Sequence, residues 1–565
     1  MRRPNAAGTI LQALEPMAKK LTELEARTLE GVAMPVAALM GELVMAARAA
    51  ARRGTELLLQ QAAAVVPAEP SCPACSSRNV GSHGFEPTSF IGRVGRVELS
   101  RRRLECGTCK HSWFDFDERW RLPAGDYADD VREATERLSC RLGFREAVDE
   151  LEHLWGVAPD ASTAQRWTIQ DGQRAEQAVA ADAKQHWERY EQRAHAVAAG
   201  EQRDEARTQG FGVIEVDGVH VLTWKPGQEP RKGAASNTKA VGAAVVEPAA
   251  EGHEPRKVAA NDTEAVGAAV VEPAAEGHEP RKVAANDTSV PAPTATSVGS
   301  ESSGRVDHQA PSTLSQVAGS PMGPTGRSPR VRGREVCMGL TYLGEDACEE
   351  SPGRGVLLER RYVATLNHRE DFWKQLHAAA QAQGVLARQA VVRLSDGGAY
   401  FVDRSAELFR DQPLVGILDI QHGKQHVWEA GHKVVADKKD LRDWVLPRID
   451  AIRDGRVGSV ILDLAEERER RTVQQQREAI ESLRGYLDRH QQLMDYPRYR
   501  KAGYPVASAA VESANKRLVG RRFKQGGMIW SEGGVEAMVA LRVAFYNPGA
   551  WGRLWPHAAP TAAAA

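Results

Sequence analysis

Four of the seven cysteines in this 565-residue chain form two Cys-x-x-Cys pairs, "CPAC" at Cys72 and Cys75 and "CGTC" at Cys106 and Cys109. Each pair can present two thiolates to one tetrahedral ion from a tight turn, and two pairs complete a four-cysteine zinc site. Seven cysteines are too few for a disulfide scaffold, so the pattern favours metal in a reducing compartment. We therefore expect a zinc ribbon with structural Zn²⁺ over residues 67–122, with one or two hairpins between the pairs.

An acidic residue in the stretch "GFGVIEVDGVHVLTW", residues 210–224, has two possible interpretations. Asp217-Gly218 between two apolar runs is a strong signal for a tight hairpin turn. An aspartate in the middle of a strand that is apolar on both faces is also a way to present a metal-binding carboxylate. The stretch alone leaves both interpretations open.

The bulk composition excludes several classes of protein. Hydrophobic residues make up 42% and charged residues 26%, which is typical of globular proteins, and the length exceeds what one core can organise. The net charge of −1 means that any nucleic-acid binding must come from local basic patches. No apolar run reaches 18 residues, and Glu15 interrupts what would be the core of a signal peptide. We expect a cytoplasmic protein.

Two N-terminal regions are predicted to be helical. Residues 1–66 are rich in Ala, Leu, Glu and Arg, with helix breaks near 31–35 and at Gly54, and we interpret them as a packing or dimerisation region. Residues 123–200 contain two helices and a third that opens at "STAQRW", where Ser162 is a good N-cap. This order favours a helix-turn-helix, and a plain three-helix packing unit is the alternative.

Two sets of polar residues are candidates for DNA contact in these regions. The start of the third helix offers Thr163, Gln165 and Arg166. The ribbon offers a basic face at Arg101, Arg102 and Arg103, and its alternative interpretation is a solvated surface.

The segment 226–331 differs in kind from its surroundings. The sequence "EPRKVAANDTEAVGAAVVEPAAEGH" recurs with a period of 25, and aromatic residues are absent throughout. Fewer than three copies with few large apolar residues cannot build a solenoid core. We interpret the segment as a disordered insertion grown by duplication, in the hairpin connection after Trp224.

Without this insertion, strands and helices follow in the order β-β-β-α-β-α-β. The strands are "GVIEVDGVHVLTW", "REVCMGLTYLG", "RRYVATLNH", "QAVVRLSDGG" ending at Asp396, and "PLVGILDIQHGKQHVW" with Asp419 near its end. The order predicts a mixed sheet covered by helices. A long helical region over 427–503 follows, and residues 551–565 are expected to form a disordered tail.

Several motifs in this order resemble bacterial insertion-sequence transposases of the DDE class, in particular the ISKra family and its Mutator-like relatives. They are the double Cys-x-x-Cys ribbon, "FREAVDELEHLWGV", "VDGVHV", "LSDGGAYF", "ILDIQHGKQHVW" and "SAAVESANKRLVGRRFKQGGMIWSEGGVEAMVALR". The resemblance implies an RNase H-like core in 205–225, 332–426 and 504–550, with 427–503 as an all-helical insertion domain. One departure is Ala507-Ser508-Ala509, where the family usually has Gly-Ser-Gly.

The resemblance also implies the site residues. The acidic triad matches Asp217, Asp396 and Glu512, and an auxiliary Asp-x-x-His signature matches Asp419 and His422. Three carboxylates suit two Mg²⁺ (or Mn²⁺) ions, which activate an oxygen nucleophile and stabilise the leaving oxygen in phosphodiester cleavage. Without cations, clustered carboxylates repel one another.

Each of these residues has a structural alternative. The Asp-Gly dipeptides suit turns, Glu512 can pair with Lys516 one helical turn on, Asp419 can cap a strand-to-helix junction, and His422 can be a packing residue. Glu215 and Asp403 are competing acids nearby. Beyond Glu512, a basic run is expected to hold a DNA strand, with a solvated helix as the alternative: Lys516, Arg517, Arg521, Arg522 and Lys524.

We therefore expect a nucleoid-associated bacterial transposase that binds the terminal inverted repeats of its element and target DNA. It would catalyse metal-dependent cleavage and 3′-OH strand transfer, as a homo-oligomer in the DNA complex. Two alternatives remain: a catalytically decayed DNA-binding protein that keeps the ribbon and helix-turn-helix, and a cellular nuclease of RNase H-like fold.

Overall fold

The computed structural model describes residues 6–65, 70–123, 125–200, 207–224, 331–351, 354–366, 369–525 and 528–556. The predictions for the repeat insertion, apart from residue 331, and for the chain beyond residue 556 lie outside the described residues.

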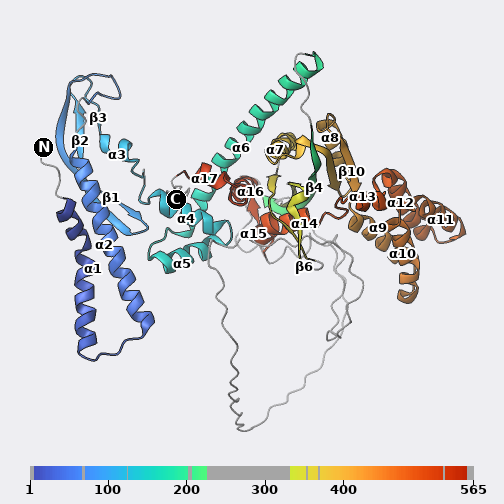
Figure 1. Cartoon of the computed structure of the whole chain (residues 1–565), viewed down its shortest axis with the longest axis horizontal. Helices are drawn as coiled ribbons and strands as arrows, with labels where there is room; N and C mark the ends of the chain where they lie inside the picture. Colours follow the sequence, from blue (N-terminus) through green and yellow to red (C-terminus); the bar gives the residue numbers. More distant parts are fainter. Residues whose placement is uncertain are drawn as a thin grey trace, which may run out of the picture.

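The N-terminal arm consists of a helical hairpin followed by a small sheet (Figure 1). Helices α1 (Ala6–Leu29) and α2 (Val36–Ala64) are separated by the expected break near residues 31–35. The predicted break at Gly54 is wrong, because α2 continues through it and a Cβ there would lie 3.4 Å from the Cβ of Ala13 in α1. The close packing against α1 offsets the modest cost of glycine inside a helix.

A three-stranded sheet carries the cysteine pairs. The strands β1 (Val80–Gly92) and β2 (Gly95–Cys106) form one antiparallel hairpin, and β3 (Ser112–Trp113) pairs with β2. Val97 and Leu99 alternate with polar residues on β2 and are buried, so the expected extended hairpin is confirmed. The short helix α3 (Asp115–Trp120) follows.

Three helices connect the arm to the rest of the molecule: α4 (Asp129–Ser139), α5 (Phe144–Trp155) and α6 (Ala161–Ala198). The predicted N-cap of α6 is wrong, because the carboxylate of Asp160 accepts hydrogen bonds from the backbone N–H groups of Ser162 and Thr163. An aspartate two residues earlier satisfies the same orphan donors.

Helix α6 is 38 residues long and packs on α16 (Glu532–Tyr546) and α7 (Arg369–Ala382) (Figure 1). A Cβ at Gly172 would lie 2.2 Å from the carbonyl oxygen of Ala537, so glycine is required for the two helices to approach this closely. Most of α6 is therefore a structural spine, and only its first turns are available for a recognition role.

The central sheet is mixed, as expected. Its strand order is β10-β9-β4-β5-β8, and β11 also pairs with β4. The strands are β4 (Thr208–Trp224), β5 (Arg332–Leu343), β8 (Arg361–Thr365), β9 (Arg388–Ser395), β10 (Leu414–Leu418) and β11 (Trp530–Ser531). Neighbours β4/β5 and β5/β8 are antiparallel, whereas β4/β9 and β9/β10 are parallel. A hairpin of β6 (Ala347–Ser351) and β7 (Arg354–Leu357) was not predicted.

Strand β4 passes straight through the ambiguous Asp-Gly. Asp217 lies opposite Met338 and Gly218 opposite Cys337 in an uninterrupted antiparallel register. The turn interpretation is therefore wrong, and the strand ends at Trp224, as the sequence predicts. β-branched residues on both sides of the dipeptide favour a strand buried on both faces.

Helices cover both faces of the sheet. Even-numbered residues of β4, such as Ile214 and Val216, pack with Phe372 and Trp373 of α7. Odd-numbered residues, such as Val213 and Val219, join the larger core that contains α16 and α14 (Ala509–Asn515). Glu215 and Asp217 therefore point into the layer that holds α14, because side chains alternate along a strand.

The expected helical region after the fifth strand is present, but it begins at Ile420 rather than at residue 427, because β10 ends at Leu418 and Asp419 caps the helix that follows. It comprises α9 (Ile420–Val434), α10 (Lys438–Arg453), α11 (Val457–Arg470), α12 (Gln474–His490) and α13 (Tyr496–Lys501), at the opposite end of the molecule from the arm (Figure 1). The remaining helices are α8 (Ala399–Leu408), α15 (Arg521–Phe523) and α17 (Ala550–Leu554). The prediction of a disordered tail from residue 551 is wrong for its first residues, because α17 reaches Leu554 and the side chains of Trp551 and Trp555 are buried. Within the described ranges, no helix is both long and apolar enough to cross a membrane.

Candidate functional site

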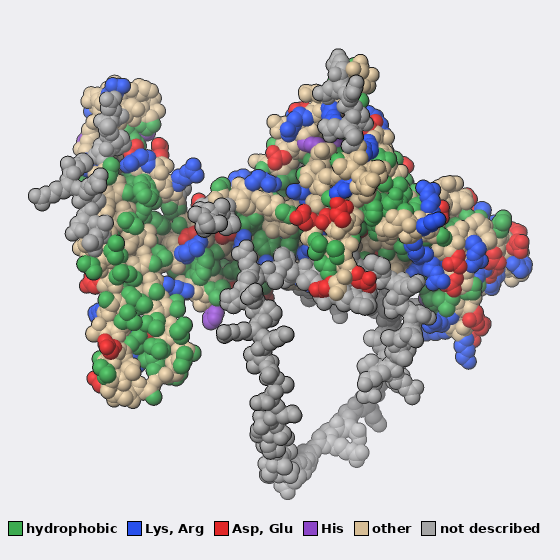
Figure 2. Space-filling model, in the orientation of Figure 1, with side chains coloured by type: hydrophobic (Ala, Val, Ile, Leu, Met, Phe, Trp, Pro, Cys, Tyr) green, Lys and Arg blue, Asp and Glu red, His purple; other side chains and the backbone are tan. Residues whose placement is uncertain are grey.

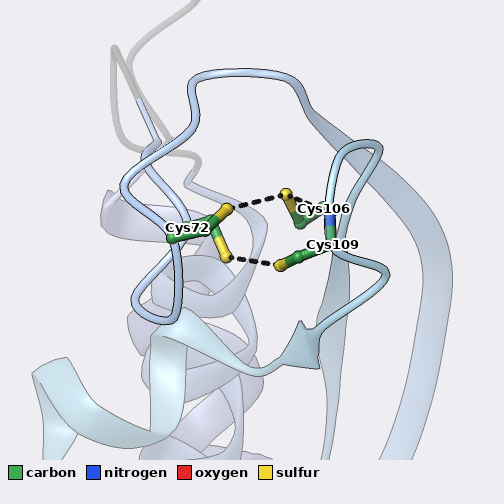
Figure 3. Close-up of side chains that lie close together, drawn as sticks. Cys72, Cys106 and Cys109 are labelled. Atoms are coloured by element: carbon green, nitrogen blue, oxygen red, sulfur yellow. Dashed lines mark hydrogen bonds between the residues drawn. The ribbon is translucent and has the colours of Figure 1, made fainter.

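The four cysteines of the two Cys-x-x-Cys pairs come together at one end of the ribbon (Figure 3). All four sulfur atoms lie within 4.8 Å of one another, with Cys72 Sγ 3.5 Å from Cys109 Sγ and Cys75 Sγ 3.6 Å from Cys106 Sγ. A tetrahedral ion with bonds of about 2.3 Å to sulfur requires sulfur separations of about 3.8 Å. The cluster therefore has the size of a metal site.

The two pairs have matching backbone geometry. Ser76 and Lys110, which follow the second cysteine of each pair, both have positive φ, at 58° and 62°. Each donates its N–H to the carbonyl of the first cysteine, Cys72 or Cys106, over 2.8 and 2.9 Å. Backbone N–H groups of Cys109 and Thr108 also lower the pKa of the Cys106 thiol to about 6. Two identical tight turns thus direct four sulfur atoms to one point.

Three aspartates lie side by side at the carboxyl ends of the parallel strands. Ser395 of β9 is paired with Val216 of β4 on one side and with Leu418 of β10 on the other. The next residue in each strand is therefore at the same edge: Asp217, Asp396 and Asp419. This edge is where open sheets with parallel strands place their ligand sites.

The surroundings of Asp217 raise the pKa of its carboxyl group. Burial raises its pKa to about 6, the N–H of Gly218 opposes that rise, and the charges of Asp396 and Glu512 add to it. The backbone N–H of Gly218 donates to Oδ1 over 2.7 Å, and Asn515 Nδ2 donates to Oδ2 over 2.5 Å. Asp217, Asp396 and Glu512 thus share one electrostatic environment, although they come from three separate segments.

Helix α14, which carries Glu512, is attached to the sheet by two carboxylates. Glu215 of β4 is completely buried, accepts from Tyr342 Oη over 2.7 Å and accepts the backbone N–H of Val511 over 2.9 Å. Ser508 occupies the N-cap of α14 without capping it, and its hydroxyl donates to Asp419 Oδ2 over 2.6 Å. Glu215 therefore supplies the acceptor that an N-cap side chain usually provides.

Asp419 also has a capping role, which is the structural alternative for this residue. Its Oδ1 accepts from the backbone N–H of Gln421 at the start of α9, and the side chain is buried. His422 lies in the first turn of the same helix, with its ring 5.6 Å from that of His426. The charge of His422 contributes to the environment of Asp217, so the Asp-x-x-His pair lies beside the acidic row.

The acidic residues do not form a compact single-ion cluster. Among the described residues, the four cysteines are the only group of three or more potential ligands whose atoms all lie within 4.8 Å of one another. Glu512 is exposed at the protein surface, whereas Asp217 and Asp396 are half-buried. The arrangement is an open edge with one exposed carboxylate.

The ribbon arginines are largely engaged within the protein. Arg101 pairs with Asp117 and lies over the Phe114 ring at 3.9 Å. Arg103 pairs with Glu86 at 3.0 Å, and Arg102 lies over a phenylalanine ring at 5.0 Å. The expected open basic face is therefore corrected to a partly neutralised one.

The first turn of α6 presents two of its three expected DNA contacts. Gln165 and Arg166 are exposed. Thr163 is buried, and its hydroxyl donates to Asp160 Oδ2 over 2.8 Å, so its predicted exposure is wrong. The capping role of Asp160 directs Thr163 inward.

The basic run after Glu512 divides into an exposed and a buried set. The exposed residues are Lys516, Arg521 and Lys524. Arg522 is almost completely buried, donates to the carbonyl of Ser139 over 3.1 Å and lies 4.6 Å from the Phe144 ring, and Arg517 is buried as well. The prediction that Arg517 and Arg522 form a DNA-holding surface is therefore wrong, because Arg522 packs against α4 and α5 and Arg517 lies over the Tyr546 ring of α16 at 5.6 Å.

Three positioning residues were missed or misjudged from the sequence. Glu215 lies two residues before Asp217 on the same strand face. This spacing indicates that both side chains enter the same layer, but from the sequence Glu215 is only a competing acid. Asn515 lies three residues after Glu512, one helical turn away, where it can reach the same site. Ser508 was noticed only as part of an altered Gly-Ser-Gly pattern.

A row of rings borders Asp396 on the side of the helical region. The His426 ring lies 3.9 Å from that of Tyr486, which lies 4.8 Å from that of His490. A Cβ at Gly397, where φ is +87°, would lie 3.1 Å from His490 Cε1. Glycine is therefore needed after Asp396 for the chain to turn beneath this row.

Comparisons with known proteins add no family to this geometry. No protein-family model matches the chain, and no curated protein matches it.

Proposed function

We propose that the chain is an insertion-sequence transposase of the DDE class with an RNase H-like core. The observation that carries the proposal is the row at the sheet edge, where Asp217 and Asp396 directly follow the last parallel pair of β4 and β9 and α14 brings Glu512 alongside. The hydrogen bonds from Val511 to Glu215 and from Asn515 to Asp217 support a shared role for the three carboxylates, because both join the helix that carries Glu512 to the strand that carries Asp217.

Asp217, Asp396 and Glu512 would hold two Mg²⁺ or Mn²⁺ ions. Such ions supply an activated oxygen nucleophile and stabilisation of the leaving oxygen. The donor set fits, because all three side chains offer hard oxygen ligands. In a site with two ions about 3.5–4 Å apart, the carboxylates need not all coordinate the same ion. The open spacing of these three carboxylates therefore suits a two-ion site better than a single-ion site.

The residues around the acids prepare them for this role. Asn515 and the N–H of Gly218 orient the two oxygens of Asp217. The raised pKa of Asp217 means that a cation must compete with a proton near neutral pH, and metal binding should release that proton. Asp419 acts through Ser508 and thereby helps to hold the start of α14.

The four-cysteine cluster would hold a structural Zn²⁺ that closes the ribbon. We expect one zinc per chain by metal analysis, lost in Cys106→Ser because three thiolates leave a structural site incomplete. The matched control is Cys348→Ser, which changes an exposed cysteine outside the cluster and should keep the zinc. Equal zinc in both variants would exclude this assignment.

DNA contact would come from the ribbon, from a helix-turn-helix formed by α5 and the first turn of α6, and from the exposed basic residues near Glu512. The exposed side chains that would take part are Gln165, Arg166, Lys516, Arg521 and Lys524. Such contacts mainly neutralise phosphates, so binding should weaken steeply with salt. The partners are the terminal inverted repeats and target DNA, with more than one copy of the chain in the complex.

The test is the reaction of the full chain with DNA carrying the sequences that flank its coding region. With Mg²⁺ we expect cleavage at the element ends and joining of the new 3′-OH to a second DNA, and neither product in EDTA. Cleavage without joining would favour a nuclease instead. Binding of the ends without cleavage would favour a DNA-binding protein that has lost catalysis.

A further inference from the structure

Exposed large apolar side chains are concentrated in the α1–α2 hairpin. Figure 2 shows hydrophobic side chains over much of this arm. Leu11 is 72% exposed, Met40 57% and Leu58 59%, values unusual for side chains of this size. Contiguous apolar surface of this kind marks an interaction site.

The exposed residues follow the spacing of a helical bundle. On α2 they recur at intervals of three, four or seven residues: Ala37, Met40, Val44, Ala47, Ala51 and Leu58. On α1 the same spacing gives Leu11, Leu14, Ala18 and Leu21. We call these ten residues the apolar seam. An average repeat of 3.5 residues is what keeps two helices in contact along their length.

Both parts of the seam lie on one face of the hairpin. The two helices contact each other through Leu24 of α1 and through Ala46 and Ala50 of α2, which are buried. Successive residues are about 100° apart around a helix axis. The seam residues of each helix therefore lie about 105° around its axis from the residues that contact the other helix, and they lie in the direction of increasing residue number on both helices. Because the helices run in opposite directions, equal rotation in the same sense brings both parts to the same face.

The other face of the hairpin is polar. Lys20 pairs with Glu42 at 2.9 Å, and Arg27 pairs with the same carboxylate at 3.2 Å. Helical periodicity puts these three side chains on the side away from the seam. The hairpin therefore has one face satisfied by ion pairs and one apolar face with no cover among the described residues.

We propose that two copies of this chain join through the apolar seam as a four-helix bundle. A face as long as α1, about 36 Å, and two helices wide, about 20 Å, offers roughly 700 Å². Stable interfaces bury about 600–1,000 Å² per partner, so the seam has the required size. A two-fold axis between the two copies places their identical seams face to face. Both seams then have the residue spacing of three and four that helices in a four-helix bundle use to pack.

A second copy also supplies the core that the hairpin lacks. Its fully buried side chains are Leu24 and small alanines, including Ala46, Ala50 and Ala63, too little apolar volume to hold helices of 24 and 29 residues. The bundle joins the chains at the arm, away from the acidic row (Figure 1). The dimer thus does not depend on the proposed function, although that function would gain two acidic sites for two DNA ends.

The test measures the mass of the full-length chain by light scattering over a range of concentrations. Wild type should have twice the chain mass of 61.6 kDa. Leu14→Glu and Val44→Glu should each raise the dimer dissociation constant at least tenfold, because each places two carboxylates in the bundle core. Both side chains are about half exposed in the single chain, so circular dichroism should show unchanged helix content.

The matched control is Met45→Glu. Met45 is next to Val44 and is 63% exposed, but it lies about 125° around the helix from the centre of the seam. This variant should dimerise like wild type. A monomeric wild-type chain, a dimer indifferent to both seam substitutions, or equal disruption by Met45→Glu would overturn the proposal, and none of these results depends on DNA cleavage.

Discussion

Asp217→Asn should lower Mg²⁺-dependent cleavage of end DNA at least about a thousandfold, equivalent to about 4 kcal/mol of transition-state stabilisation. The amide has the shape of the carboxylate but no charge, so the site loses a charged ligand while the strand keeps its packing. Asn at this position still accepts from the N–H of Gly218, and its amide can donate to Asn515 Oδ1, which is buried without a partner among the described residues. The fold should therefore persist.

Two measurements separate chemistry from binding in this variant. End-DNA binding in EDTA, measured by fluorescence anisotropy, should stay within about threefold of wild type, because phosphate contacts come from other residues. The matched control is Asp403→Asn, which changes an exposed acid on α8 and should cleave normally. If Asp217→Asn still cleaved at the wild-type rate, Asp217 would not be a metal ligand.

Glu215→Ala should reduce cleavage about a hundredfold, although Glu215 contacts no DNA or metal in this account. Its removal leaves the Tyr342 hydroxyl and the Val511 N–H unsatisfied in a buried space, at a cost of about 1–3 kcal/mol for each group. The start of α14 should then shift, and Glu512 with it. Glu215→Gln should restore activity to within tenfold, because the amide oxygen accepts from Val511 and its N–H donates to the tyrosine oxygen.

Wild type and Glu215→Gln should differ in the pH dependence of stability. Burial raises the pKa of Glu215 to about 7, opposed by the hydrogen bond from Tyr342. The native state therefore holds a proton that the unfolded chain releases near pH 4.5, so this group stabilises the fold at low pH. The free energy of unfolding should fall as pH rises from about 4.5 to 7, and Glu215→Gln should flatten that decline in denaturant titrations. An unchanged slope would mean that Glu215 is ionised in the folded protein.

The element order of the core could be predicted from the sequence because its signals are local. Strands such as 210–224 alternate or run apolar, and residues 210–224 and 332–343 predict one hairpin interrupted by the repeat segment, which matches the pairing of β4 with β5. The strand through Asp217 followed from the same argument. Parallel pairing then placed Asp217, Asp396 and Asp419 at one edge without any knowledge of side-chain contacts.

The errors concern charges whose partners are distant in sequence. Arg522 appears as one cation in a basic helix, but Ser139 and Phe144, nearly 400 residues earlier, enclose its guanidinium. From the sequence, Glu215 is a competing candidate for the metal-binding acid, because no neighbouring residue indicates that the backbone N–H of Val511 needs an acceptor. Asp160 caps α6 in place of Ser162, because the helix begins two residues earlier than the sequence predicts. Tertiary packing determines these partners, so the spacing of residues along the sequence does not reveal them.

The central claim is that Asp217, Asp396 and Glu512 together hold divalent metal. Its most direct test counts Mn²⁺ bound to the zinc-loaded full chain by electron paramagnetic resonance, with end DNA present, for wild type and for Asp217→Asn. The account predicts two Mn²⁺ per chain in wild type, weaker binding as pH falls below about 6 because Asp217 takes up a proton, and loss of at least one ion in the variant. Equal Mn²⁺ binding by wild type and Asp217→Asn, or none by either, would contradict it.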